Sequence, residues 1–192
     1  MARPIEYDPQ EVLINAMHLF WEQGYEATSI QDVVKATGLK PGSLYNRYGN
    51  KEGIFEAVVN QYATSSLVHI DDILHQQANA FTNIEIFLQE IIIETISNEK
   101  TQGCLLVKTL LVLPNKDVHI QKHIVEFFDE IEELLAQTLQ VAKTQGSTKV
   151  EPKSFAKFIV TAIFGLHAYH KTHQDKSVLE ENVRHILACL KV

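Results

Sequence analysis

Helix-start and helix-stop signals recur along the whole chain, and no segment carries a convincing strand pattern. A start combines an N-capping side chain with apolar residues three and four positions apart, and a glycine or proline ends the segment. The expected starts are Asp8-Pro9, Thr28 with Gln31, Asn50-Lys51, Thr82 with Glu85, Pro152, and Ser177 with Glu180. The expected stops include Gly24, Gly38 and Pro114. This succession predicts an all-α fold of about nine helices.

Helix length divides the chain into two parts. The segments before about residue 75 are mostly short, and those after it are longer. We therefore expect an N-terminal domain over 6–66, with a helix-turn-helix at 29–48, and a helical domain over 67–192. A chain of 192 residues can bury roughly 70% of its unfolded surface, so it needs no disulfide framework.

Composition excludes several protein classes. Hydrophobic residues make up 45% and charged residues 21%, which is an ordinary globular balance. The opening MARPIEYDPQ lacks the apolar core of a signal peptide, and the apolar stretch 104–113 is much shorter than a membrane span. We expect a soluble cytoplasmic protein without a membrane partner.

Charge is distributed unevenly in the N-terminal part. The formal net charge is −7, but the segment from Val33 to Lys51 contains Lys35, Lys40 and Arg47 and no acid. Local charge matters more than the total, because salt screens charges over about 10 Å. A basic segment across two short helices joined by a glycine-containing turn is typical of a DNA-binding helix-turn-helix.

The second helix of this pair has the chemistry of a recognition helix. Leu44 and Tyr48 are four positions apart and can pack inward, which turns Ser43, Asn46 and Arg47 outward with Tyr45 at the flank. Asparagine suits adenine, and arginine suits guanine or phosphate. Phosphate contacts are also expected from two residues at helix N-termini, Thr28 and Lys51.

Four runs resemble one known family: TSIQDVV at 28–34, AxGL at 36–39, PGSLY at 41–45 and YxxKE at 48–52. Together they resemble the DNA-binding domain of the TetR family of transcriptional regulators. The resemblance implies a homodimeric repressor that binds a palindromic double-stranded operator and is released by a small effector. It also implies DNA contacts by Lys40, Ser43, Tyr45, Asn46 and Lys51. Asn46-Arg47 replaces the family's more usual aromatic-His pair, which leaves the base preference open.

The C-terminal part has more inward-facing aromatic and aliphatic residues than a tight three-helix core needs. Ligand pockets are lined in this way, so we expect a cavity for a small apolar effector within 82–170. Its expected wall consists of Phe87, Ile91, Leu110, Phe127, Phe128 and Phe164, with Cys104 at or near it.

Cys104 has two interpretations. A cysteine among apolar residues is usually buried as a small hydrophobe. A branch of the TetR family, however, starts its sixth helix with Gly-Cys-Leu beside the pocket, as Gly103-Cys104-Leu105 does here, and some members sense electrophiles or oxidants there. Cys189, on the apolar side of the last helix, is interpreted as packing.

A dimer interface is expected from the last two helices. Small residues on the first of them, Ala162, Gly165 and Ala168, would allow close helix approach. The last helix would add Leu179, Val183, Ile186 and Leu190 to an isologous four-helix interface. The alternative is that both stripes pack within one subunit.

Other functions find less support in the sequence. A small-molecule enzyme with an all-α fold would need a catalytic set, and no P-loop, GxSxG or HExxH motif is present. A regulator could also use the helix-turn-helix for protein contact. His119 and His123, or His167, His170 and His173, share helix faces, but no cysteine or clear carboxylate completes a site. We therefore expect no bound metal and no cofactor.

Overall fold

The computed structural model describes residues 7–96, 103–112 and 118–191. Within these ranges the chain forms nine helices and no strand, which confirms the all-α prediction. The helices are α1 (Pro9–Gln23), α2 (Ile30–Thr37), α3 (Pro41–Tyr48), α4 (Lys51–His75), α5 (Ala80–Ile96), α6 (Leu105–Val112), α7 (Val118–Thr144), α8 (Pro152–His173) and α9 (Lys176–Leu190).

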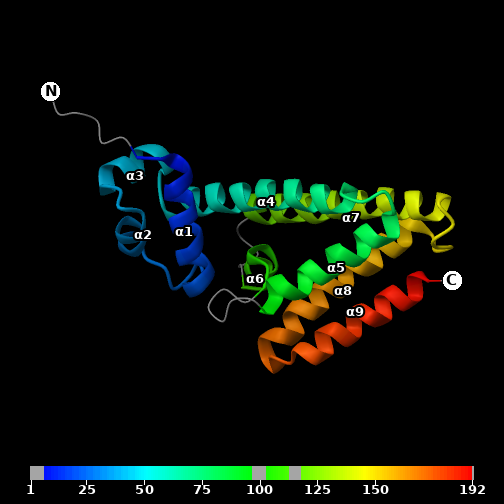
Figure 1. Ribbon diagram of the computed structural model, residues 1–192. Helices are drawn as coiled ribbons and strands as arrows, with labels where there is room; N and C mark the ends of the chain where they lie inside the picture. Colours follow the sequence, from blue (N-terminus) through cyan, green and yellow to red (C-terminus); the bar gives the residue numbers. More distant parts are fainter. Residues whose placement is uncertain (1–6, 97–102, 113–117, 192) are drawn as a thin grey trace.

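The helices α1 to α3 form a small bundle at one end of the molecule (Figure 1). Its core contains Phe20 of α1, Val33 of α2, Leu44 of α3 and Phe55 at the start of α4. The rings of Phe20 and Phe55 meet edge to face, with 4.9 Å between centroids. These buried side chains hold α2 against α1 and α3 against α4.

Helix α4 joins this bundle to the rest of the chain. It runs without a break across residues 66 and 67, the expected domain boundary, and lies alongside α7 for much of its length (Figure 1). Helices α5, α8 and α9 cross beneath this pair, and α6 lies between α5 and the N-terminal bundle. A movement of α6 or α4 can therefore reach the bundle through direct contacts.

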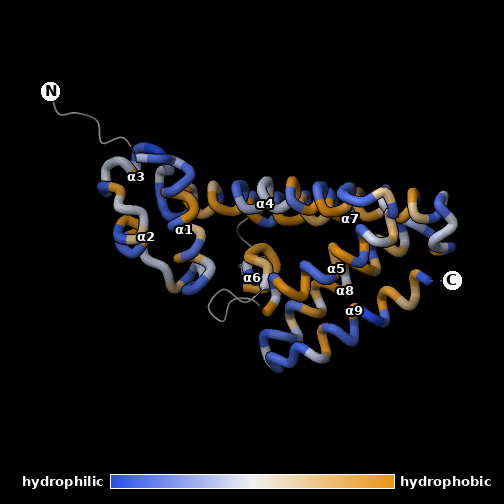
Figure 2. Tube along the Cα trace, viewed as in Figure 1, coloured by the Kyte–Doolittle hydropathy of each residue, from blue (hydrophilic) through white to orange (hydrophobic). Residues whose placement is uncertain are grey.

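The hydropathy of each helix agrees with how deeply the helix is buried in the fold. Figure 2 shows α6 as almost uniformly hydrophobic, whereas α9 alternates hydrophilic and hydrophobic segments along its length. Accordingly α6 buries Leu105, Leu106 and Val107, and α9 buries one stripe only. None of the helices within the described ranges is long and apolar enough to cross a membrane.

Three helix starts differ from the predicted positions because a neighbouring polar residue is the cap. Helix α2 is capped by Ser29, whose hydroxyl accepts from the Asp32 N–H at 3.2 Å while the Asp32 carboxylate accepts from the Ser29 N–H at 2.9 Å. At α5 the Asn79 side chain accepts from the N–H groups of Phe81 and Thr82, and at α9 Asp175 is the cap. The expected stop at Pro114 lies outside the described residues.

Candidate functional site

Helix α3 buries one face and exposes the other. Leu44 is completely buried in the bundle, and Tyr48 is half-buried against it. The side chains predicted to face DNA are exposed, or half-exposed in the case of Ser43: Lys40, Ser43, Tyr45, Asn46 and Arg47. The structure thus gathers these five residues on α3 and its N-cap, while their contact with DNA stays a prediction.

Arg47 is held toward the start of α1. Its guanidinium carbon lies 5.9 Å from the ring centroid of Tyr7 and 5.7 Å from that of Tyr48. Both distances are within the range of cation–π attraction. The contact orders an exposed cation at the C-terminal end of α3, beside Asn46.

Two predicted phosphate ligands contribute to the loop before α2: Thr28 belongs to it, and Lys51, the first residue of α4, bonds to it. Thr28 is only 1% exposed, and its hydroxyl donates to the Gly24 carbonyl at 2.7 Å. Lys51 Nζ donates to the carbonyl oxygens of Tyr25 and Thr28 at 2.9 and 3.0 Å. The prediction for the Thr28 hydroxyl is therefore corrected, because burial keeps it from a phosphate. Lys51 has a third N–H, so its predicted phosphate contact remains a prediction.

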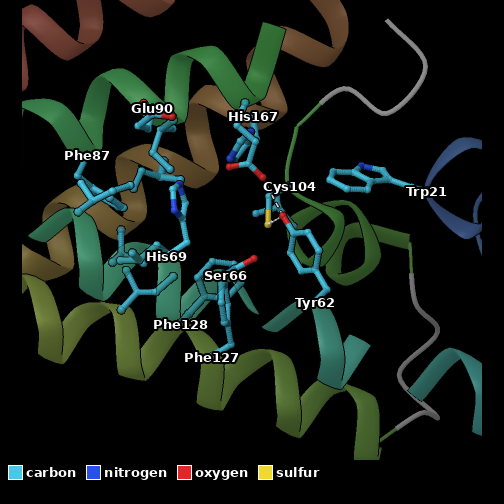
Figure 3. Close-up of a pocket in the computed structure, with 18 residues that line it drawn as sticks. Trp21, Tyr62, Ser66, His69, Phe87, Glu90, Cys104, Phe127, Phe128 and His167 are labelled. Carbon is cyan, nitrogen blue, oxygen red and sulfur yellow. Dashed lines mark hydrogen bonds between the residues drawn. The ribbon is translucent and has the colours of Figure 1, made fainter. Parts of the chain in front are cut away.

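A second candidate site is a cavity of about 220 Å³ among α1, α4, α5, α7 and α8 and the start of α6 (Figure 3). Five of the predicted wall residues line it: Phe87, Ile91, Cys104, Phe127 and Phe128. The other two lie elsewhere. Phe164 stacks against Phe128 with 4.4 Å between centroids and does not line the cavity, and Leu110 is half-buried on α6.

The cavity is largely apolar, with polar groups gathered around Cys104. The Tyr62 hydroxyl donates to Glu94 Oε1 at 2.7 Å, and the same hydroxyl oxygen lies 3.6 Å from Cys104 Sγ. Burial raises the pKa of Glu94 and, together with the neighbouring acidic groups, that of Tyr62. A buried carboxyl group thus lies beside Cys104 in a largely apolar wall.

His167 of α8 lines the same part of the cavity. Its Nδ1 lies 3.1 Å from the Thr95 hydroxyl, and its Nε2 is buried without a hydrogen-bond partner among the described residues. Burial, reinforced by the neighbouring His170, lowers the pKa of His167 to about 4, so the ring is neutral near pH 7. Gly103, with a φ of +80°, lets the chain pass close by: a Cβ there would lie 2.9 Å from His167 Nδ1.

Cys104 lies at the cavity wall but is not an activated thiol in this conformation. It is buried, and desolvation raises the pKa of its thiol to about 12. The thiolate is the reactive form, so burial protects Cys104. Cys189, predicted to be packed, is instead exposed, because α9 turns that edge away from α5 and α8.

The histidine sets do not form a metal site in the part of the chain that is described, where no group of three metal-binding side chains is found. His123 lies 3.4 Å from a carboxylate oxygen of Glu56 and 3.7 Å from one of Glu126, on the surface. His167 and His170 are buried, and His173 is exposed and stacks on Tyr169. The first set therefore lies at the surface, whereas the second set is divided between the core and the surface.

Comparison with known families identifies both parts of the chain. Residues 12–58 match "Bacterial regulatory proteins, tetR family", and residues 85–186 match "Tetracyclin repressor-like, C-terminal domain". The second match alone spans more than half of the chain. The chain belongs to the TetR family. It is a DNA-binding transcription regulator, as the motifs at 28–52 predicted.

Relatives of this TetR-family protein include two with HTH-type names. The transcriptional repressor ComR of Escherichia coli (strain K12) is 51% identical over 61 residues, which is 32% of this chain and 29% of that protein. The uncharacterized regulator YezE of Bacillus subtilis (strain 168) is 25% identical over 186 residues, covering 95% of this chain and 96% of that one.

Two solved structures have the same fold. A cysteine mutant of the TetR-family regulator CifR, complexed with a 26-base-pair operator DNA, superimposes with a TM-score of 0.86 at 25% identity. The alignment covers 98% of this chain and all of that one. The reduced form of E. coli NemR gives a TM-score of 0.85 at 18% identity, covering 92% and 93% of the two chains.

Sequence reasoning missed most of the cavity wall of this TetR-family chain, including four residues that carry polar groups: Trp21, Tyr62, Glu94 and His167. Trp21 is the least expected, because it belongs to α1 of the DNA-binding bundle and its ring meets that of Tyr62 edge to face at 5.3 Å. The one feature of the sequence that could have drawn attention to Trp21 is that it is the single tryptophan of the chain.

The residues predicted for the TetR-type dimer interface separate into two groups. Gly165 and Ala168 are exposed on α8, and Ala162 is half-buried. Leu179, Val183, Ile186 and Leu190 are at most 4% exposed, because they pack against α5 and α8 of the same subunit. The α9 part of the prediction is therefore corrected, since these four side chains are not at the surface.

Proposed function

We propose that this chain is a homodimeric repressor that binds a palindromic operator and leaves it when a small effector fills the cavity. The observation that carries the proposal is the exposed side of α3, where Asn46 and Arg47 lie beside Ser43 and Tyr45 while Leu44 anchors the helix. Small and polar side chains on an anchored short helix are what reading of a major groove requires.

Release by an effector is supported by the position of the cavity. Its wall includes Trp21, which belongs to the DNA-binding bundle, and Cys104 at the start of α6. A molecule that binds there contacts both parts of the chain. If it fits one relative placement of the bundle better than another, it shifts the population toward that placement. The two recognition helices of a dimer would then no longer match successive major grooves.

Dimerisation is supported by an exposed stripe on α8. Phe158, Gly165 and Ala168 are exposed and share one side of the helix with Thr161. Phe158 is 47% exposed, although its ring meets that of Phe155 edge to face with 5.2 Å between centroids. We propose that this stripe, with the outer side of α9, meets its symmetry mate.

Selection from random duplexes tests the repressor proposal. The protein should enrich a palindrome, and gel shifts should show affinity falling with salt according to the number of phosphates contacted. Asn46→Ala should relax preference at one operator position by about 1–3 kcal/mol. Lys40→Ala should weaken binding to every sequence and reduce the salt slope. The matched control is Lys143→Ala, at the end of α7.

Failure to enrich any duplex would overturn the repressor and leave the protein-contact alternative. The matched relatives are transcription regulators, which favours regulation over an all-α enzyme. We propose that the protein acts in the cytoplasm, where its operator would be. A thiol-sensing repressor is the second candidate because Cys104 lines the cavity, but its raised pKa favours a reversible, non-covalent effector.

A further inference from the structure

The polar groups of the cavity reveal what an effector would have to offer them. Thr95 has one hydroxyl proton, and the Thr95 hydroxyl donates it to the Ile91 carbonyl at 2.6 Å. The same oxygen lies 3.1 Å from His167 Nδ1, so it must accept there, and Nδ1 carries the ring proton. In a neutral imidazole the other nitrogen is then a bare acceptor. His167 Nε2 is that acceptor, and among the described residues nothing donates to it.

An unpartnered acceptor in this position points to a ligand. His167 is only 7% exposed, and its side chain lines the cavity. A buried polar atom without a hydrogen bond is costly, and native structures seldom keep one without a functional reason. A ligand with an N–H or O–H group would satisfy it.

Two donors of the same region already have partners. The indole N–H of Trp21 donates to the Gly103 carbonyl at 3.1 Å, and the Tyr62 hydroxyl donates to Glu94 at 2.7 Å. Glu94 and Thr95 are consecutive on α5, and Thr95 bonds His167. The carboxylate of Glu94 and the acceptor of His167 therefore belong to the same end of the cavity.

The ionisable groups of the described wall are mainly acidic. They are two carboxyl groups, Glu90 and Glu94, and two imidazoles, His69 and His167, of which His69 acts electrostatically on Glu94; no lysine or arginine lines the described wall. The remaining surface is apolar and rich in aromatic faces, including Trp21, Phe127 and Phe128 (Figure 3). Aromatic faces attract cations, and a charge pair is stronger in a desolvated site than in water.

We propose that the effector is a small hydrophobic amine, bound in its protonated form. Its N–H groups donate to the Glu94 carboxylate and His167 Nε2, and its apolar body lies against the aromatic wall. This inference rests on the proposed function, because it names the ligand class of the same cavity. A volume of about 220 Å³ is below the range of roughly 300–1,000 Å³ that holds drug-sized ligands, so the amine is small.

Three probes of matched size separate the possible ligand chemistries: 2-phenylethylamine is a cation at pH 7, 2-phenylethanol is neutral, and 3-phenylpropanoate is an anion. Trp21 is the single tryptophan and lines the cavity, so quenching of its fluorescence reports binding in the full-length protein. The amine should bind at least about tenfold more tightly than the alcohol, because it adds charge-assisted hydrogen bonds. The propanoate should bind most weakly.

Variants test which side chains of the cavity bind the amine. Glu94→Gln keeps the shape and removes the charge, and it should weaken the amine about tenfold while leaving the alcohol unchanged. His167→Leu removes the Nε2 acceptor and should also weaken the amine. Glu130→Gln, an exposed carboxylate of α7 outside this cavity, is the matched control and should change neither affinity.

The proposal is overturned if the alcohol or the propanoate binds as tightly as the amine, or if no amine of this size quenches Trp21. The three probes are compared on the unaltered protein, so the ligand class is decided even where a variant fails to fold. Operator binding in gel shifts is measured on the same preparation. Intact operator binding without amine preference overturns the ligand class alone, whereas absence of operator binding overturns the proposed function.

Discussion

The indole N–H of Trp21 donates to the carbonyl oxygen of Gly103 at 3.1 Å, across a sequence separation of 82 residues. The Lys108 ammonium donates in the opposite direction, from α6 to the Trp21 carbonyl. These two hydrogen bonds connect the end of α1 to Gly103 and to Lys108 of α6, and we call this pair of contacts the joint between the two parts of the chain. Because the indole also lines the cavity, a molecule bound there would touch this joint.

Trp21→Phe should weaken this joint while leaving α3 intact. The phenyl ring keeps part of the apolar contact but has no N–H for Gly103. We expect operator affinity to stay within about threefold of the parent, since α3 is unaltered. A compound that releases the parent from its operator should release the variant less completely, because coupling free energies between sites are typically about 1–3 kcal/mol. Fluorescence anisotropy of a labelled operator, titrated with the compound, measures this.

A control for that comparison is Phe164→Leu, which changes an aromatic residue near the cavity but outside its wall. It should keep the parent's release curve. Equal release by the parent and by Trp21→Phe would show that the signal does not pass through this joint.

Lys51→Met should destabilise the fold. Lys51 Nζ bonds the carbonyls of Tyr25 and Thr28 and lies 4.2 Å from the Tyr25 ring centroid. Hydrogen bonds from a charged donor contribute roughly 1.5–3 kcal/mol each, and partial exposure of Lys51 reduces this. We expect a loss of about 2 kcal/mol in the free energy of unfolding, measured by urea denaturation. Lys35→Met, on the exposed side of α2, should change it by less than about 0.5 kcal/mol. Equal losses would contradict the structural role of Lys51.

The sequence is sufficient for features that depend on short spacings. The pair Leu44 and Tyr48 determines which side of α3 is exposed, and glycines at 24 and 38 end α1 and α2. Caps are predicted less well, because Thr28 and Ser29 can both cap a helix. The turn between α1 and α2 decides between them: the Thr28 hydroxyl donates to the Gly24 carbonyl, and Ser29 remains to cap the helix.

The cavity can be predicted only in part, for a related reason. Periodicity identifies inward-facing residues such as Phe87 and Phe127, but it does not say which helices meet. Trp21 and Gly103 approach each other only in the folded chain, so no local pattern indicates their contact. The same limit explains why the sequence favours a dimer interface for the α9 stripe, since an apolar stripe looks alike whether its own subunit or a partner covers it.

Gly165→Leu should produce monomers. A Cβ at Gly165 would meet nothing within 4 Å in its own subunit, so the leucine finds open space there. Loss of subunit stability is therefore not expected, and replacing glycine within a helix is favourable by up to about 1 kcal/mol. In a close helix–helix interface the same side chain would clash. Light scattering measures the mass, and Gly165→Ala is the control that should remain dimeric. A Gly165→Leu variant that stays dimeric would place the interface elsewhere.

The two thiols should react in the order set by burial. Cys189 is exposed, and Cys104 is buried with a pKa raised to about 12. An aromatic disulfide reagent at about pH 8 should modify one thiol at once and the second only on unfolding, and Cys189→Ser should abolish the fast phase. Fast modification of Cys104 in the Cys189→Ser variant, with release of operator, would instead favour the thiol-sensing candidate.

Acid should destabilise the protein through His167. An imidazole normally titrates near 6.5, whereas burial, with help from His170, lowers the pKa of His167 to about 4 in the folded state. Between these values the unfolded chain binds a proton that the folded chain does not, so stability is present above about pH 6.5 and is lost as the pH falls toward 4. The difference corresponds to roughly 3 kcal/mol when the whole interval is crossed.

Urea denaturation at about pH 7 and pH 4.5, at fixed protein concentration, measures this loss. It should be smaller for His167→Leu than for the parent, because leucine has no proton to bind. His185→Gln, at an exposed position of α9, should lose as much stability as the parent. If His167→Leu also follows the parent, then His167 becomes protonated without unfolding, and its Nε2 would not be the bare acceptor on which recognition of an amine depends.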